Sequence, residues 1–498
     1  MKDTQPKLIL IFSLFIFLSG CAPFQVKQAP LSFQKPEQCR EFLNRLDEIV
    51  KETGVRDASS VPIHGFPYLR ANRFLASLKK NLKDDGEKAE WARWMQGLDL
   101  LARQKEINNL PDQAILSLEI EDGKRADREW LYAQVKSCSS KLLSHDQARL
   151  DFYATLYPHV HVPSEYSCSR RTIGLYPVVA IPVALVTELS QEKIRKRFDT
   201  ELKDLPIDGE LRPFVPEKRI FLSEDQVREI IEKSKRNPLG VPMLEKRQEE
   251  KLAYSFAPVF IQDVAASYDR LGRVVWKGDR VDIDPEKPTV YYYISHAFLK
   301  REPILKINYV IWYPERAGKR SPSIEKGHLD GLTVRVSLDG QGSVFMVDVV
   351  SDCGCYHFFS PDREQVDHAV SRLFRFGPFV AQWLPATPSG ERLGIRINSG
   401  WHQVQRLISV GELPNSIPYP LVPYDVLEAL PHEEGRTESI FNSKGIAKGS
   451  ERVERFILFS MGIPSVGSMR QRGHHAIELI GKDHFDNPHL FDENFIFK

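Results

Sequence analysis

The sequence predicts an α+β fold, in which an N-terminal helical domain precedes a domain with a mainly antiparallel sheet and flanking helices. Apolar residues recur at helical spacing as far as about residue 157, whereas from about residue 251 they alternate in short runs between turns. The chain has 498 residues, too many for one ordinary core. We expect a helical domain over 37–165 and an α+β domain over 166–498, with a candidate sub-boundary near 380–420.

The helical domain is predicted from stripes of apolar residues three or four positions apart, which usually mark the core face of a helix. Gly54 follows the first stripe and is expected to end that helix. The stripes are Phe42, Leu43, Leu46, Ile49 and Val50, then Leu69, Phe74, Leu75, Leu78 and Leu82, then Trp91, Trp94, Leu98 and Leu101, with a fourth helix over about 125–153.

The first part of the α+β domain contains an apolar run and a helix start. The run Ile173–Val186 is too short for a membrane span and is interrupted by Pro177 and Pro182, so we expect buried extended chain. Ser223 and Gln226 form a capping-box pattern that is expected to begin a helix.

Alternating apolar residues predict the strands of the second domain, and Gly-containing turns such as Asp339–Gly342 separate them. Two more helices are expected over 365–374 and 451–461. The predicted strands are 254–260, 274–276, 290–294, 304–313, 332–338 and 344–350.

The N-terminus has the pattern of a secretory signal. Lys2 and Lys7 precede a short apolar run that ends in Ser19, Gly20 and Cys21. The Leu-Ser-Gly-Cys ending resembles the lipobox of bacterial lipoproteins. An ordinary cleaved signal with a nearby cysteine is the alternative.

The lipobox resemblance implies that residues 1–20 are a lipoprotein signal peptide and that Cys21 is the lipidated, palmitate-bearing first residue of the mature chain. Residues 21–36 would form a tether. Ala22 stands where an aspartate would imply inner-membrane retention, so we expect an outer-membrane anchor with the protein facing the periplasm. Several acyl chains would hold the protein stably on the bilayer.

The charge balance limits the partners. Lys and Arg total 68 and Asp and Glu total 67, which gives a net charge of +1. This balance favours neither nucleic acid nor an anionic bilayer, so we expect no nucleic-acid partner and membrane attachment through lipid alone. Five cysteines remain beside Cys21, so in an oxidising compartment at most two disulfides form and one thiol is left.

One predicted hairpin gathers reactive side chains. If Gly340 and Gln341 form its loop, His328 faces Cys353 and Asp330 faces Ser351. Alternation places Leu332, Val334, Val336, Leu338, Phe345, Val347 and Val349 on one face, and Thr333, Arg335 and Asp348 on the other. Beyond its apolar part, the first face would continue with His328, Asp330, Cys353, Cys355 and His357.

Three interpretations of this cluster remain open. It is structural if one cysteine forms a disulfide with Cys168 and the other side chains are hydrogen-bonded. It binds zinc or copper if Gly354 bends the chain enough to converge the ligands. It is catalytic if a cysteine nucleophile is activated by His328 or His357 and oriented by Asp330.

A weaker metal candidate lies near the C-terminus, where His474, His475, His484 and Asp486 occur close together and Arg470 and Arg472 could hold an anion. Solvated loop histidines are the alternative. The sequence lacks the motifs of common metalloproteases, lipases, P-loop ATPases and c-type cytochromes, which disfavours those functions.

Three strings, Gly65–Leu75, His328–Gly331 and Cys353–Phe359, resemble an uncharacterised family of proteobacterial envelope lipoproteins. The resemblance covers most of the mature chain and implies no known activity. The sequence favours a periplasmic thiol- or metal-dependent, hydrolase-like enzyme. The alternative is a non-catalytic envelope binding or assembly lipoprotein, in which the helical domain would contact envelope protein partners.

Overall fold

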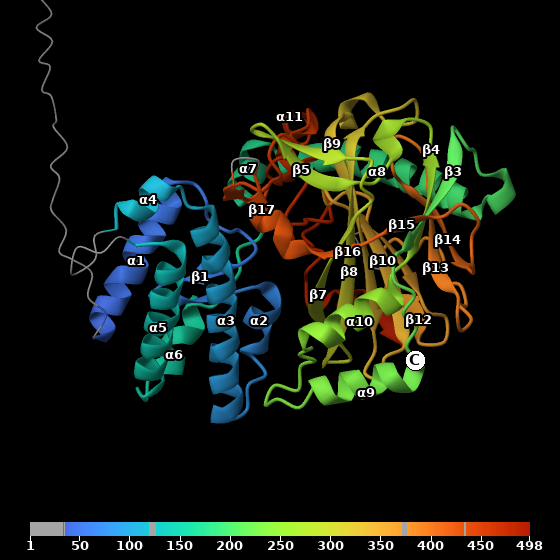
Figure 1. Cartoon of the computed structure of the whole chain (residues 1–498). Coiled ribbons are helices and arrows are strands. Elements are labelled where there is room, and N and C mark those ends of the chain that lie inside the picture. The colour runs from blue at the N-terminus through green and yellow to red at the C-terminus, as the bar shows by residue number, and fades with distance from the viewer. Residues whose placement is uncertain (1–32, 34, 119–125, 371–375, 433–434) are drawn as a thin grey trace, which may run out of the picture.

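The computed structural model describes residues 33, 35–118, 126–370, 376–432 and 435–498 (Figure 1). The predicted signal segment, Cys21 and nearly all of the predicted tether lie outside these residues. Helices dominate the N-terminal part and mainly antiparallel sheets follow, so the predicted α+β class is confirmed.

Three long helices frame the N-terminal domain: α1 (Pro36–Glu52), α3 (Asp85–Asn109) and α5 (Arg128–Gln147). They coincide with three of the four predicted helices. The remaining stripe is divided between a strand and a helix, because the Asn72 side chain accepts a hydrogen bond from the Leu75 N–H and so caps a new helix. The shorter elements are β1 (Val61–Ile63), β2 (Phe66–Ala71), α2 (Arg73–Leu78), α4 (Asp112–Leu116) and α6 (Phe152–Leu156).

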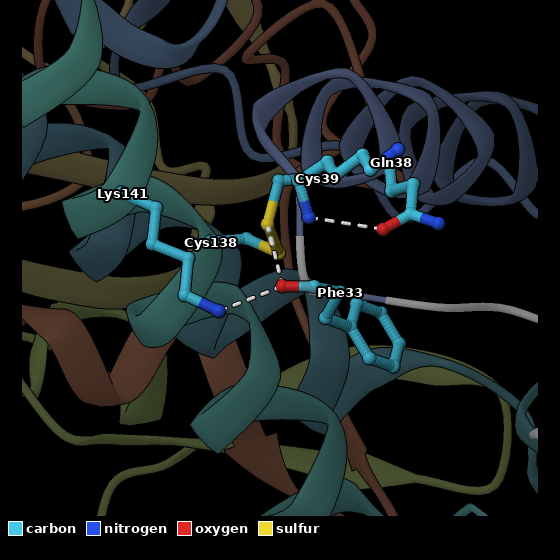
Figure 2. The surroundings of a disulfide bond; sticks show 6 residues. Phe33, Gln38, Cys39, Cys138 and Lys141 are labelled. Atoms are coloured by element: carbon cyan, nitrogen blue, oxygen red, sulfur yellow. Dashed lines mark hydrogen bonds between the residues drawn. A yellow bond between two sulfur atoms is a disulfide. The ribbon is translucent and has the colours of Figure 1, made fainter.

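A disulfide joins α1 to α5 inside this core (Figure 2). Cys39 and Cys138 are both fully buried and lie 99 positions apart in the chain. Beside them, the Lys141 ammonium donates a hydrogen bond of 2.7 Å to the Phe33 carbonyl. The disulfide therefore cross-links the first helix of the domain to its last long helix.

Two sheets form the second domain. The larger has the order β11-β10-β9-β8-β7-β16, antiparallel except for β7 and β16; the smaller has the order β14-β13-β4-β3-β15. The strands of the larger sheet are β7 (Val290–Leu299), β8 (Glu302–Arg316), β9 (Gly327–Leu338), β10 (Val344–Ser351), β11 (Phe358–Pro361) and β16 (Leu421–Pro423). Those of the smaller sheet are β3 (Glu210–Pro216), β4 (Val259–Val264), β13 (Arg392–Ile397), β14 (Val404–Val410) and β15 (Ile417–Tyr419).

The central strands of the larger sheet are buried on both faces. Tyr309 belongs to the core that this sheet shares with the smaller sheet, together with Ile395. Trp312, on the opposite face, packs in a second core with Trp276 of the hairpin β5 (Arg273–Lys277) and β6 (Arg280–Asp284). Polar side chains on either face of these strands are thus shielded from water.

The segment 173–186, which we predicted to be buried extended chain, is helical instead. It spans the end of α7 (Cys168–Ile173) and the first half of α8 (Tyr176–Asp199). Pro177 lies in the first turn of α8, where a missing N–H costs no helical hydrogen bond, and Pro182 is accommodated in the helix interior. Within the described ranges, no helix is long and apolar enough to cross a membrane.

Other predicted elements are confirmed or corrected locally. Ser223 and Gln226 form the expected capping box of α9 (Glu224–Ser234). The strand predicted over 254–260 begins later, as β4 at Val259, because helix α10 (Lys246–Phe256) extends into that segment. The side chain of Gln248 caps the start of this helix by accepting from the Glu245 N–H.

Neither of the last two predicted helices forms over its full length. Residues 366–369 form strand β12 (Val366–Ala369), which pairs with β19 (Phe495–Phe497), and residues 371–375 lie outside the described part. In 451–461, only α11 (Glu454–Ile457) and a 3₁₀ turn at 459–461 are helical. The remaining short elements are β17 (Leu430–Pro431), β18 (Thr437–Glu438) and α12 (Leu490–Asn494).

The β9–β10 hairpin pairs in a register two residues away from the predicted one. Leu332, not Asp330, lies opposite Ser351, because the loop is longer than two residues and Gly342 adopts φ +89°. A shift by two preserves the face of each side chain, so the predicted apolar face is confirmed over most of the hairpin. Phe345 is the exception: the strand has an irregularity there, and the ring packs in a different core.

Candidate functional site

A cavity of about 470 Å³ lies beneath α8, next to the open end of the β9–β10 hairpin. Side chains of α8 form one wall, and the segment 353–359 after β10 forms another. Residues of 376–379, 454–466 and 476–480 also contribute to the lining. Most of these residues are aliphatic or aromatic, and the volume is typical of small-molecule sites, roughly 300–1,000 Å³.

Cys353 and Cys355 meet on the wall of this cavity. Gly354 adopts φ +86°, and a side chain at this position would collide with the Ala476 carbonyl oxygen, so only glycine fits the turn. The turn brings the Cys355 N–H within 3.4 Å of the Cys353 sulfur. Both cysteines are free thiols, with Cys353 buried and Cys355 half-buried.

The two thiols affect each other's protonation. A hydrogen bond from the Cys355 thiol, assisted by the charge of Arg316, lowers the pKa of Cys353 to about 7. The same hydrogen bond, together with burial, raises the pKa of Cys355 well above its usual range. Near neutral pH the pair therefore contains one readily formed thiolate and one retained thiol, a combination that suits nucleophilic attack followed by resolution.

Asp330 belongs to a buried ionic network instead of pairing with a thiol. The Arg316 guanidinium donates to both of its oxygens, at 2.9 and 2.8 Å. His402 lies between Asp330 and Asp269, at 2.8 and 3.2 Å, and stacks on Tyr313. Burial raises the pKa of Asp330, but Arg316 and His402 outweigh burial and hold this pKa below its ordinary value.

The two histidines proposed as partners of the thiols are bonded to other groups, although His357 lines the same cavity. Leu329 adopts φ +59°, and His328 contacts the Val281 carbonyl at 2.7 Å. Tyr356 adopts φ +52°, and His357 contacts Asp348 at 2.7 Å, on the face opposite the predicted one. Positive φ angles interrupt the alternation of side chains, so the prediction that all five residues share one face is wrong.

The charged side chains that line the cavity are carboxylic acids, among them Glu325 and Glu454. Burial raises the pKa of Glu454 to about 8, so this carboxyl is mostly protonated at neutral pH. Glu325, in contrast, accepts hydrogen bonds from Arg316, Trp401 and Tyr356, at 2.8, 2.8 and 2.5 Å. Among the described residues, no lysine or arginine lines the cavity. An anionic ligand would find no counter-charge there.

The C-terminal histidines are also divided among separate structural contacts. His474 bonds to Glu165 and to the Ala58 carbonyl, whereas His484 accepts from the Glu165 N–H. His475 is buried, and burial lowers its pKa to about 3. Asp486 pairs with Arg73 at 3.2 Å.

The two arginines of this segment are occupied as well. Arg470 donates to the backbone carbonyls of Cys353, Pro464 and Ser465, and Arg472 pairs with Asp425 and Glu428. Their guanidinium groups are therefore committed to contacts within the protein.

Neither of the predicted clusters forms a metal site in the described part of the chain. No group of three or more His, Cys, Asp or Glu side chains there is arranged so that it could hold a metal ion. The alternative of a disulfide between Cys168 and the hairpin is not what the structure contains, since Cys168 is an exposed thiol on α7.

Comparisons with protein families, curated proteins and solved structures found no match. The site must therefore be interpreted from its own geometry.

The outer face of α8 is apolar as well. While Val183, Thr187, Ser190 and Ile194 line the cavity, the opposite side of the helix is exposed. Its large apolar side chains are 58–66 % exposed: Val178, Ile181, Leu185 and Leu189. Nearby, Phe456 and Ile457 of α11 are 69 and 54 % exposed. Monomeric soluble proteins seldom expose such a continuous apolar surface unless it contacts a lipid or a partner.

Sequence reasoning missed three components of the site: α8, Glu454, and the pairing of Asp330 with His402. The high apolar content of 173–189 was a usable signal, because a helix that is apolar on all sides contacts apolar surroundings on all sides. Asp330 and His402 lie far apart in the chain, and no local pattern connects them.

Proposed function

We propose that this chain is a lipid-anchored envelope protein that binds an apolar ligand in the cavity beneath α8. The observation that carries the proposal is that the N-terminal half of α8 is mostly apolar on both sides, with one side lining the cavity and the other exposed. A lipid surface would solvate the outer face and would also supply the ligand.

The polar groups of the cavity limit the chemistry of the ligand. A protonated Glu454 and a neutral His357 tolerate an uncharged ligand, and burial is the cause of both pKa shifts. An acidic lining without a cationic side chain disfavours phosphate or carboxylate headgroups. The best-fitting class is therefore an aliphatic or aromatic molecule whose polar end is neutral.

A cavity-filling substitution tests this proposal. Val183→Trp should weaken binding of the neutral apolar dye phenylnaphthylamine by about 5- to 150-fold, since overpacking costs about 1–3 kcal/mol and about 1.4 kcal/mol corresponds to tenfold. Dye fluorescence titrated against the purified full chain gives the dissociation constant.

Val178→Trp is the matched control, because it adds the same ring to the exposed face of the same helix. Equal affinities of the two variants, or no saturable dye binding by the unmodified chain, would refute an apolar ligand site here.

The Cys353–Cys355 pair supports a second candidate function, thiol–disulfide exchange. The Cys353 thiolate attacks one sulfur of a substrate disulfide, and the first thiol leaves. Cys355 then loses its proton and attacks the Cys353 sulfur, releasing the second thiol. The protein pair is oxidised to a disulfide, and the substrate disulfide is reduced to two thiols.

A resolving-cysteine variant tests the exchange. Both proteins carry Cys168→Ser and are treated with bis(hydroxyethyl) disulfide. The protein that keeps both cysteines should form a disulfide between Cys353 and Cys355, whereas the Cys355→Ser variant should retain a mixed disulfide on Cys353. Peptide mass mapping after acid quenching distinguishes the products. The reaction should accelerate as pH rises through about 7, because the Cys353 thiolate then forms. Stable mixed disulfides on the unmodified pair would contradict exchange.

A further inference from the structure

A second cavity, of about 250 Å³, lies between the helical domain and the larger sheet. Residues of α3, including Lys105, and of 72–74 line it from the helical side. Strands β7, β8 and β9 line it from the other side, with Ser295, Lys306 and Arg335. Unlike the cavity beneath α8, this one is rich in cations, so it calls for a different ligand.

Lys306 is the unusual residue of this cavity. It is 2 % exposed and lies in the middle of β8, between Ser295 of β7 and Ser337 of β9. Among the described residues, its ammonium has no hydrogen-bond or ion-pair partner. Ser337, its cross-strand neighbour, also has a buried hydroxyl without a partner. Two adjacent polar groups on one buried face are thus unsatisfied.

The other charges of the cavity do not neutralise Lys306. Arg73 pairs with Asp486, Arg335 pairs with Asp348, and Lys105 and Arg472 share Asp425 and Glu428. With Asp348 and Glu428 counted beside the lining carboxylates Asp425 and Asp486, Lys306 is the one lining cation, among the described residues, that these pairs leave over.

We infer that the cavity between the domains binds a small oxyanion, carboxylate or phosphate, with Lys306 as its counter-charge. An unpaired ammonium in a buried site is costly, and a bound anion removes that cost. A neighbouring donor favours the same class of ligand, because the hydroxyl of Ser337, opposite Lys306 on β9, is unpartnered. The small volume restricts the ligand to simple acids.

Protonation of Lys306 provides a specific readout. Burial lowers the pKa of Lys306 well below its ordinary value, and Arg335 lowers it further, while Asp348 and Asp486 oppose the shift. A bound oxyanion would stabilise the ammonium form and raise this pKa. Binding should therefore draw protons from the buffer, and the measured heat should depend on the ionisation enthalpy of the buffer.

Isothermal titration calorimetry of the full chain tests the inference, with inorganic phosphate and succinate as separate probes. One of them should bind with proton uptake, and Lys306→Met should weaken that binding by about 10–100-fold, the equivalent of losing a charged hydrogen bond. Lys326→Met, an exposed lysine preceding β9, is the matched control and should change nothing.

Thermal unfolding separates loss of binding from loss of fold. Without anion, Lys306→Met should unfold at a temperature at least as high as the unmodified chain, because it removes an unpaired buried amine. The binding anion should raise the unfolding temperature of the unmodified chain only. If neither anion binds the unmodified chain, or if Lys306→Met binds with equal affinity and proton uptake, the inference is wrong.

Discussion

Replacing Asp330 with asparagine should destabilise the protein by about 3–5 kcal/mol, the usual cost of breaking a buried ion pair by removing one partner. The substitution keeps the shape of the side chain but leaves Arg316 and His402 without their shared carboxylate. Since Asp330 is fully buried, water cannot solvate the partners that lose its carboxylate. The free energy of unfolding in denaturant measures the effect.

Asp208→Asn is the matched control. Asp208 also binds one arginine through both oxygens, but it and Arg320 are about one third exposed. Solvent screens such pairs, so the loss should stay below about 1 kcal/mol. If the two substitutions lower the free energy of unfolding equally, burial of the Arg316–Asp330–His402 network does not add to its effect on stability.

Removing the Cys39–Cys138 disulfide by the double substitution to alanine should cost about 4–5 kcal/mol. The cross-link closes a loop of about one hundred residues, and in the chain-entropy model the stabilisation grows with the logarithm of loop length. The loss should appear as a lower free energy of unfolding, and reduction of the unmodified protein should reproduce it.

Cys168→Ala provides the comparison, since Cys168 is exposed and unbonded to another cysteine. It should change stability by no more than about 0.5 kcal/mol. If the double variant is as stable as this control, the disulfide does not stabilise the fold, and the prediction is wrong.

The elements that the sequence predicted well are those whose physics is local. Helices α1 and α9 follow from apolar spacing and capping, and strands β8 and β9 from alternation. Helix α8 was not predicted, because Pro177 and Pro182 were both taken to interrupt a helix. Pro177 occupies the first turn, where proline is tolerated, and the helix accommodates Pro182 in its interior.

The candidate site was predicted less well because its geometry depends on backbone reversals and distant contacts. Alternation fails at Leu329 and Tyr356, where positive φ angles turn His328 and His357 away from the thiols. The proximity of Cys353 and Cys355 survives, because the intervening Gly354 determines it locally. Asp330 finds its partner in His402, which the fold alone supplies.

The contacts between the two domains join residues from the first quarter of the chain to residues near its C-terminus. Asn109 donates to the Glu428 carbonyl at 2.8 Å, Gln471 donates to Asp57 at 2.8 Å, and His474 contacts the Ala58 carbonyl. The ribosome, and an export channel after it, deliver the helical domain first and these C-terminal partners last. The helical domain therefore exposes these polar groups until the end of the chain arrives, and docking of the two domains waits for that arrival, not for helix formation.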